Sequence, residues 1–208
     1  GNTWFSSPND SLTLSLGFLL EPKNWLGLSL CVGIDLVQSM DPQQRLDLQL
    51  KWPNDVWVKR NGQYRKLAGI LIETLTTNLP QKDSARYCVV GIGVNIQTPA
   101  FEMDAHAIPP LGLFELAPER SANDIILDLA RRLPKTLHCF ELEGFSPFKP
   151  KFEALNALQG LDLYLSDGTR GICHGVNDQG ELMLLRNGTL QAHNNLELSV
   201  RPFGTPKT

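Results

Sequence analysis

The stretch that decides the fold is Tyr87-Cys88-Val89-Val90-Gly91-Ile92-Gly93-Val94-Asn95-Ile96. It is nearly all apolar, which is typical of a central strand covered on both faces. Three further segments have strand-like patterns, at residues 12–20, 47–52 and 67–73. Together they predict a sheet around this strand.

Helical patterns alternate with these strands. Apolar residues at helical spacing predict a helix from Asn24, as its N-cap, to about Met40. Ser121-Ala122-Asn123-Asp124 has capping-box character and predicts a helix to about Glu143, which Pro134 should kink or break. A shorter helix is expected over 150–158, whereas 59–65 and 98–120 are expected to be loops.

The pattern changes after Gly160. Turn signals recur about every ten residues, at Asp167-Gly168, Asp178-Gln179-Gly180 and Asn187-Gly188. They predict a small SH3-like β-barrel. We therefore expect an α/β (α+β) fold, with a mixed central sheet flanked by helices in residues 1–158 and the β-domain in residues 159–208.

Composition excludes several classes of protein. The 208 residues are 42% hydrophobic and 20% charged, with 19 Lys+Arg against 22 Asp+Glu, a formal charge of −3. This composition excludes a disordered chain, and the charge argues against a large nucleic-acid interface. The sequence contains no long apolar run, no signal-peptide pattern and four scattered cysteines without a Cys-x-x-Cys pair. These features predict a cytoplasmic protein with buried thiols, no membrane partner and no metal cluster.

Lys51-Trp52-Pro53-Asn54-Asp55 is the most informative short motif. Pro53 should end the strand, so Asn54 and Asp55 are expected in the loop beyond it, where α/β sites are built. A carboxylate beside an amide can hold a metal ion, a water molecule or an incoming amine. An ordinary Pro-Asn-Asp turn is the alternative interpretation.

Two glycine-containing strands supply further candidates. Lys66 stands at the mouth of the strand Leu67–Glu73, where a cation would meet an anionic ligand, and Gly69 would let that ligand approach the backbone. A solvated lysine and a packing glycine are the alternative. Gly91-Ile92-Gly93-Val94-Asn95 is not a dinucleotide fingerprint, because the third glycine is absent. Glycines in a strand indicate that a helix or a ligand needs the room.

Trp4 and Phe5 precede the first strand, where an aromatic ring either stacks on a planar base or covers the edge of the core. The four histidines show neither ligand spacing nor a catalytic-triad pattern.

Taken together, these segments resemble the biotin protein ligase family. The matching pieces occur in the family's order: Trp4-Phe5-Ser6-Ser7-Pro8, Lys51-Trp52-Pro53-Asn54-Asp55, Lys66-Leu67-Ala68-Gly69-Ile70-Leu71-Ile72-Glu73, Gly91-Ile92-Gly93-Val94-Asn95, and a C-terminal β-domain ending in Glu197-Leu198-Ser199-Val200-Arg201. The resemblance covers essentially the whole chain. It implies a class II synthetase-like catalytic fold.

The resemblance also implies a two-step reaction. Biotin and MgATP form biotinyl-5′-AMP, and the biotinyl group then passes to a lysine of a biotin carboxyl carrier protein. By resemblance the catalytic residues are Lys66 and Asp55. The residues implied in substrate binding are Trp4, Ser15, Lys51, Asn54, Gly69, Leu71, Gly91, Asn95, Glu197 and Arg201. Metal ligands stay unassigned.

The chain departs from the family pattern at its start. The family's Gly/Arg-rich loop, its first strand and its Ser-Thr-Asn segment have no counterpart before Trp4. We therefore expect a gap on one side of the biotin pocket and little or no ligase activity from these residues alone. Two alternatives stay open: a ligase-like protein that binds biotin or nucleotide without catalysis, and an interaction module. Self-association as a homodimer also stays open.

Overall fold

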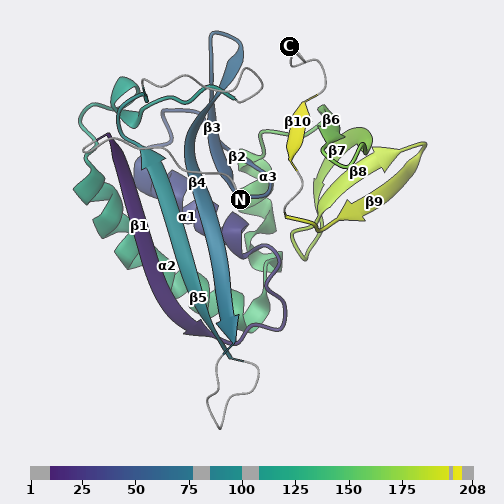
Figure 1. Ribbon diagram of the computed structural model, residues 1–208, viewed down its shortest axis with the longest axis horizontal. Coiled ribbons are helices and arrows are strands. Elements are labelled where there is room, and N and C mark those ends of the chain that lie inside the picture. Colours follow the sequence, from purple (N-terminus) through teal and green to yellow (C-terminus); the bar gives the residue numbers. More distant parts are fainter. Residues whose placement is uncertain (1–9, 77–84, 100–107, 197–198, 203–208) are drawn as a thin grey trace.

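The first sheet has five antiparallel strands in the order β1-β5-β4-β3-β2. It belongs to a computed structural model that describes residues 10–76, 85–99, 108–196 and 199–202. The strands are β1 (Ser11–Leu20), β2 (Leu48–Lys51), β3 (Asp55–Arg60), β4 (Gln63–Thr76) and β5 (Arg86–Asn95). Figure 1 shows this sheet in front, with the helices behind it.

Three helices accompany this sheet: α1 (Leu28–Met40), α2 (Ala122–Glu143) and α3 (Lys149–Leu155), with short 3-10 turns at η1 (Leu113–Glu115) and η2 (Ser146–Phe148). Helix α1 packs on β2, β3 and β4, and α2 packs on α1 and β1. The buried face of α2 carries Ile125, Leu129, Leu133, Leu137 and Phe140. This arrangement buries one face of the sheet, and the opposite face stays open over much of β1, β4 and β5.

The second sheet is antiparallel, with the order β10-β6-β7-β8-β9. Its strands are β6 (Asp162–Leu165), β7 (Arg170–Val176), β8 (Leu182–Arg186), β9 (Thr189–His193) and β10 (Val200–Pro202). Gly168, Gly180 and Gly188 have positive φ at the three predicted turns, a conformation that glycine adopts without steric cost. The α/β fold with an additional β-unit is therefore confirmed, but the expected mixed central sheet is corrected, because all strand pairs of the described first sheet are antiparallel.

The hairpin of β3 and β4 corrects the predicted loop at 59–65. Asn61 and Gly62 both have positive φ and join the two strands in a two-residue turn. Asp55 is the first residue of β3, not a loop residue. The Asn-Gly turn signal is present in the sequence, but the polar residues around it obscure the short apolar run of Val56, Trp57 and Val58.

Three other expectations are corrected. Pro134 does not break α2, because Leu133 and Leu137 are buried on either side of it and hold the helix in place. Asn24 does not cap α1: its Oδ1 accepts from the amide of Leu26, and the helix begins after Gly27. Strand β5 is an interior strand, between β1 and β4, but Tyr87 is half exposed, so only one face of its first half is covered.

The capping box at the start of α2 is confirmed. Ser121 Oγ accepts from the amide of Asp124, and Asp124 Oδ2 accepts from the amide of Ser121. None of the helices within the described ranges combines the length and apolarity needed to cross a bilayer.

Candidate functional site

The corner between β2 and β3 places two charged side chains on one face. Lys51 ends β2, Asp55 begins β3, and the two residues are directly paired in the ladder. The turn between them is held from below, because Ser29 Oγ in α1 donates to the carbonyl of Pro53 at 2.9 Å. The sequence motif therefore forms a fixed corner supported by the buried helix.

Asp55 lies between two lysine ammonium groups. Its Oδ1 is 2.6 Å from Lys66 Nζ, and its Oδ2 is 3.7 Å from Lys51 Nζ. The side chains of Asp55 and Lys51 are 15% and 8% exposed, whereas that of Lys66 is 33% exposed. Two cations around one carboxylate leave a surplus positive charge, and Lys66 is the cation that an anionic ligand can reach.

Burial lowers the pKa of Lys51, because the buried ammonium has lost its hydration. The carboxylate of Asp55 opposes this shift, and the positive charges of Lys66 and Arg201 add to it. Arg201 lies on β10, so a residue of the second sheet acts electrostatically on this corner. The Lys51 ammonium also lies 5.8 Å from the ring centroid of Trp57, within range of a cation–π contact.

Two asparagines hold the backbone around Lys66. Asn54 Nδ2 donates to the carbonyl of Ile70 at 2.8 Å, and the amide of Ile70 donates to the Asn54 carbonyl at 2.9 Å. Asn95 is 5% exposed, and its Nδ2 donates to the carbonyl of Lys66 at 3.2 Å. The side-chain amides of Asn54 and Asn95 therefore tie β4 to the corner before β3 and to β5.

The segment after β5 fixes Lys66 from its other side. The Lys66 amide donates to the carbonyl of Pro109 at 2.9 Å, and the Leu111 amide donates to the carbonyl of Lys66 at the same distance. The backbone of Lys66 is thereby held on both sides, which restricts the direction in which its side chain leaves the sheet.

On the open face of the first sheet, residues that are mostly small form a flat surface, the floor, which extends from Asp55. Asp55 is paired with Gly69, and Gly69 with Gly93. Successive side chains alternate between faces, so the neighbouring row on this face is Leu71, Gly91 and Ser15. Leu71 is 58% exposed, and a Cβ added at Gly91 would meet Leu71 atoms at an ordinary 3.5 Å. The glycines leave a shallow floor beside the ion cluster.

The structure brings together most of the residues singled out from the sequence. Lys51, Asp55 and Lys66 are in charge contact, and the floor lies on the same face of the sheet. Arg201 reaches the corner through its charge. Trp4 and Glu197 lie outside the described residues.

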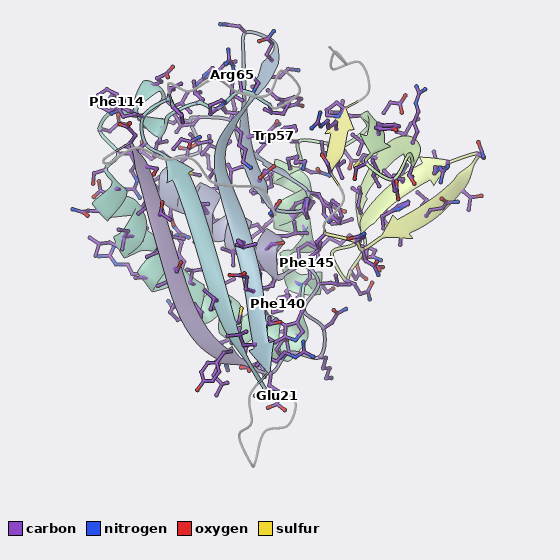
Figure 2. All side chains as sticks on the ribbon, in the orientation of Figure 1. Glu21, Trp57, Arg65, Phe114, Phe140 and Phe145 are labelled. Atoms are coloured by element: carbon purple, nitrogen blue, oxygen red, sulfur yellow. The ribbon has the colours of Figure 1, made fainter. Side chains whose placement is uncertain are left out.

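Sequence reasoning missed the role of Trp57, whose ring packs against Tyr64 at a tilt of 43° with centroids 5.1 Å apart and lies under Lys51. Figure 2 labels Trp57 beside β3 and Arg65 near the β3–β4 turn. The hairpin alternation would have placed Trp57 on the same face as Asp55. A cavity of about 380 Å³ near that turn, lined in part by Arg60, Arg65 and Thr98, shares no residue with the ion cluster.

No three His, Cys, Asp or Glu side chains among the described residues gather closely enough to ligate a metal ion. All four cysteines are free thiols, and Cys31, Cys88 and Cys173 are buried.

Comparison with known proteins shows which family the chain resembles. The model of the biotin/lipoate A/B protein ligase family matches residues 1–95. The bifunctional ligase/repressor BirA of Escherichia coli is 32% identical over 206 residues, which cover 97% of this chain and 62% of the relative. The biotin–[acetyl-CoA-carboxylase] ligase of Mycobacterium tuberculosis is 27% identical, covering 88% of this chain and 67% of the relative.

A solved structure shows the same fold. The biotin protein ligase of Aquifex aeolicus in complex with biotin and ATP superposes with a TM-score of 0.74 at 26% identity, covering 97% of this chain and 82% of that one. The chain spans 62% of the length of BirA from Escherichia coli, the curated relative described above.

Proposed function

Because this chain belongs to the biotin protein ligase family, we propose that it activates biotin with MgATP to biotinyl-5′-AMP and transfers the biotinyl group to a lysine of a biotin carboxyl carrier protein. The observation that carries the proposal is the Asp55 carboxylate between Lys66 and Lys51, beside a glycine-lined floor. A cluster with surplus positive charge beside an open floor suits a ligand whose anionic end lies at the lysines.

The first step joins two anions. The biotin carboxylate oxygen attacks the α-phosphorus of ATP, a C–O–P linkage forms, and pyrophosphate leaves with the electrons of the broken P–O bond. Lys66 lowers the barrier, because its ammonium is positioned where carboxylate and phosphate charge accumulate. Mg²⁺ bound to the nucleotide would screen the charge of its phosphates.

The second step transfers the acyl group. The acceptor amine attacks the acyl carbon, AMP leaves, and the amine loses a proton. Asp55 is the proposed acceptor of that proton and orients the amine, because it lies beside Lys66 on the face that carries the floor. Asn54 and Asn95 keep this corner in place through Ile70 and Lys66.

The remaining assignments follow the face on which each residue lies. Gly69, Leu71, Gly91 and Ser15 would form the floor under biotin, and Lys51 would fix Asp55. Trp4, Glu197 and Arg201 would contact the nucleotide, a proposal that rests on the family motif. We assign residues 1–158 to the catalytic domain and 159–208 to an SH3-like domain, since each contains its own sheet. The free thiols suit a reducing compartment, so we place the reaction in the cytoplasm.

Biotin-dependent exchange of pyrophosphate into ATP, measured in the full-length protein, tests the proposal, because these residues alone are expected to have little or no ligase activity. Lys66→Ala should lower the exchange rate by about 10²- to 10³-fold, the usual loss when one preorganised charge-stabilising group is removed. Lys59→Ala is the matched control, because its ammonium lies on the same hairpin, 5.5 Å from the ring centroid of Tyr64 and outside the ion cluster. Measurable and equal exchange by the full-length wild-type protein and its Lys66→Ala variant would overturn the assignment.

The alternative of a binding protein without catalysis is not favoured by the comparisons. Calorimetry would distinguish it, because such a protein would bind biotin while forming no adenylate when ATP is added. Homodimer formation stays a prediction for sedimentation analysis.

A further inference from the structure

The two sheets are joined by a buried hydrogen bond. Trp52, which follows Lys51, is 1% exposed, and its indole Nε1–H donates to the carbonyl of Gly180 at 3.0 Å. Gly180 lies in the turn between β7 and β8. Trp52, in the β2–β3 corner, is therefore hydrogen-bonded directly to a turn of the second sheet.

The surroundings of this bond are closely packed. A Cβ added at Gly180 would lie 2.7 Å from Gly27 Cα, and one added at Gly27 would lie 2.7 Å from Phe145 Cβ. Gly180 and Gly27 are thus in backbone contact. Figure 2 labels Phe145 on the side of the first sheet nearest the second sheet. These contacts leave the turn little room to slide against the first sheet.

Other contacts at this junction are weaker. Lys149 Nζ lies 2.9 Å from Asp178 Oδ1, but the Asp178 side chain is 62% exposed, so solvent screens the pair. A cavity of about 260 Å³ also borders the junction, with Lys23, Leu26, Gly144 and Gln179 in its lining. The buried Trp52–Gly180 bond is therefore a directional contact between the β2–β3 corner and this turn.

The junction is connected to the candidate site through both sheets. Trp52 is covalently next to Lys51, which contacts Asp55. The second sheet carries Arg201, whose charge acts on Lys51. A rotation of the second sheet about the junction would move Arg201 relative to the ion cluster.

We propose that Trp52 is a positioning residue: through its hydrogen bond to Gly180 it fixes the second sheet against the β2–β3 corner and so places Arg201 for the nucleotide. The role of Arg201 in this inference rests on the proposed ligase function. The mechanical part, the fixing of the second sheet, does not depend on any activity.

Hydrogen exchange tests the mechanical part. The Ala157 amide donates to the carbonyl of Leu50 at 2.9 Å, so its exchange rate reports on the junction where the chain leaves β2 for the second sheet. Trp52→Phe keeps a ring and removes the N–H donor, and exchange at Ala157 should rise about threefold to tenfold, as expected for one lost neutral hydrogen bond. Amides in the ladder of β7 and β8 should exchange as in the wild type.

Trp57→Phe is the matched control for this measurement. Trp57 is also buried, and its Nε1 has no hydrogen-bond partner within the described part of the chain. The same chemical change there removes ring volume but no bond to the second sheet. Equal exchange at Ala157 in both variants, or no change in Trp52→Phe, would overturn the proposal.

Kinetics test the effect on the site. Trp52→Phe should raise the KM for ATP about threefold to tenfold while kcat stays within about twofold, because positioning Arg201 affects nucleotide binding before chemistry. In an Arg201→Ala background, Trp52→Phe should raise the KM by less than about twofold, since the residue it positions is gone. Fully multiplicative effects of the two substitutions would refute positioning through Arg201. Absence of pyrophosphate exchange from the full-length wild-type protein would refute the ligase function and leave hydrogen exchange to decide the role of Trp52 at the junction.

Discussion

The Asp55 carboxylate lies 2.6 Å from the Lys66 ammonium because the β3–β4 hairpin folds the two residues onto each other. Lys66 is paired with Trp57, two residues beyond Asp55, and a register shift after Val56 changes the pairing at this point. Irregular pairing of this kind redirects side chains next to functional sites. The proposed activating cation and the proposed proton acceptor are thus a single ion pair in the resting protein.

Asp55→Asn should separate the two steps of the proposed reaction. The amide cannot take the amine's proton, so transfer to the carrier lysine should slow by about 10²- to 10⁴-fold, the usual range for loss of a general base. Adenylate formation should fall much less, because Lys66 keeps its charge. Single-turnover measurement of biotinyl-5′-AMP formation and of its consumption by the carrier protein checks this, and equal losses in both steps would contradict it.

Gly91→Ala should weaken biotin binding without unfolding the chain. The added Cβ makes ordinary 3.5 Å contacts with Leu71, so the strand can hold it, but it rises into the proposed floor. We expect the KM for biotin to rise about tenfold, equivalent to about 1.4 kcal/mol. Gly17→Ala on the same face of β1 is the control, because nothing lies within 4 Å of its added Cβ. Similar KM values for the two variants would argue against a floor at Gly91.

Lys51 should make the free energy of unfolding vary with pH in the alkaline range. Its folded-state pKa is lowered by burial, so between that value and 10.5 the unfolded chain binds more protons than the folded one. Stability should therefore rise with pH across this window and fall as the pH is lowered, by at most about 1.4 kcal/mol per pH unit for one group.

Lys51→Met lacks this contribution. The difference in unfolding free energy between the variant and the wild type should shift in favour of the wild type as the pH rises toward 10.5. Urea unfolding of both chains at several pH values measures the difference, and other titrating groups largely cancel in it. A difference that stays constant with pH would contradict the lowered pKa.

Pro134→Ala should stabilise the protein. Pro134 is exposed inside α2, where proline offers no amide to the helix ladder. Alanine restores that donor and has a higher helix propensity, so we expect a gain of about 1 to 3 kcal/mol in the free energy of unfolding. Thermal and urea unfolding would show it, and the neighbouring Lys135→Ala should change stability by less than about 0.5 kcal/mol.

Local signals in the sequence predicted much of the fold. The capping box at Ser121 and Asp124 and the glycine turns of the second sheet involve neighbouring residues, so short-range patterns were sufficient to find them. The start of α1 escaped prediction, because Asn24 closes a local turn with Leu26 instead of the helix end. Helix α2 continues through Pro134 because Leu133 and Leu137 are buried against the rest of the fold. No local sequence pattern indicates that burial.

The residues of the candidate site could be predicted from local patterns, whereas the contacts between them could not. Sequence patterns identify Lys51, Asp55 and Lys66 individually, but their contact depends on the Asn61-Gly62 turn, which lies within the expected polar loop. The bond from Trp52 to Gly180 spans 128 positions of the chain. No sequence pattern near Trp52 or Gly180 indicates this hydrogen bond, so it is visible only in the folded structure.

The two-residue turn at Asn61-Gly62 has a consequence for how the protein assembles. Closing a short loop costs little chain entropy, and hairpins form within microseconds. The charge pair of Asp55 and Lys66 can therefore form from contiguous chain, before the second sheet has been synthesised. Substitutions in the second sheet should then alter how the site is completed and leave its ionic centre assembled.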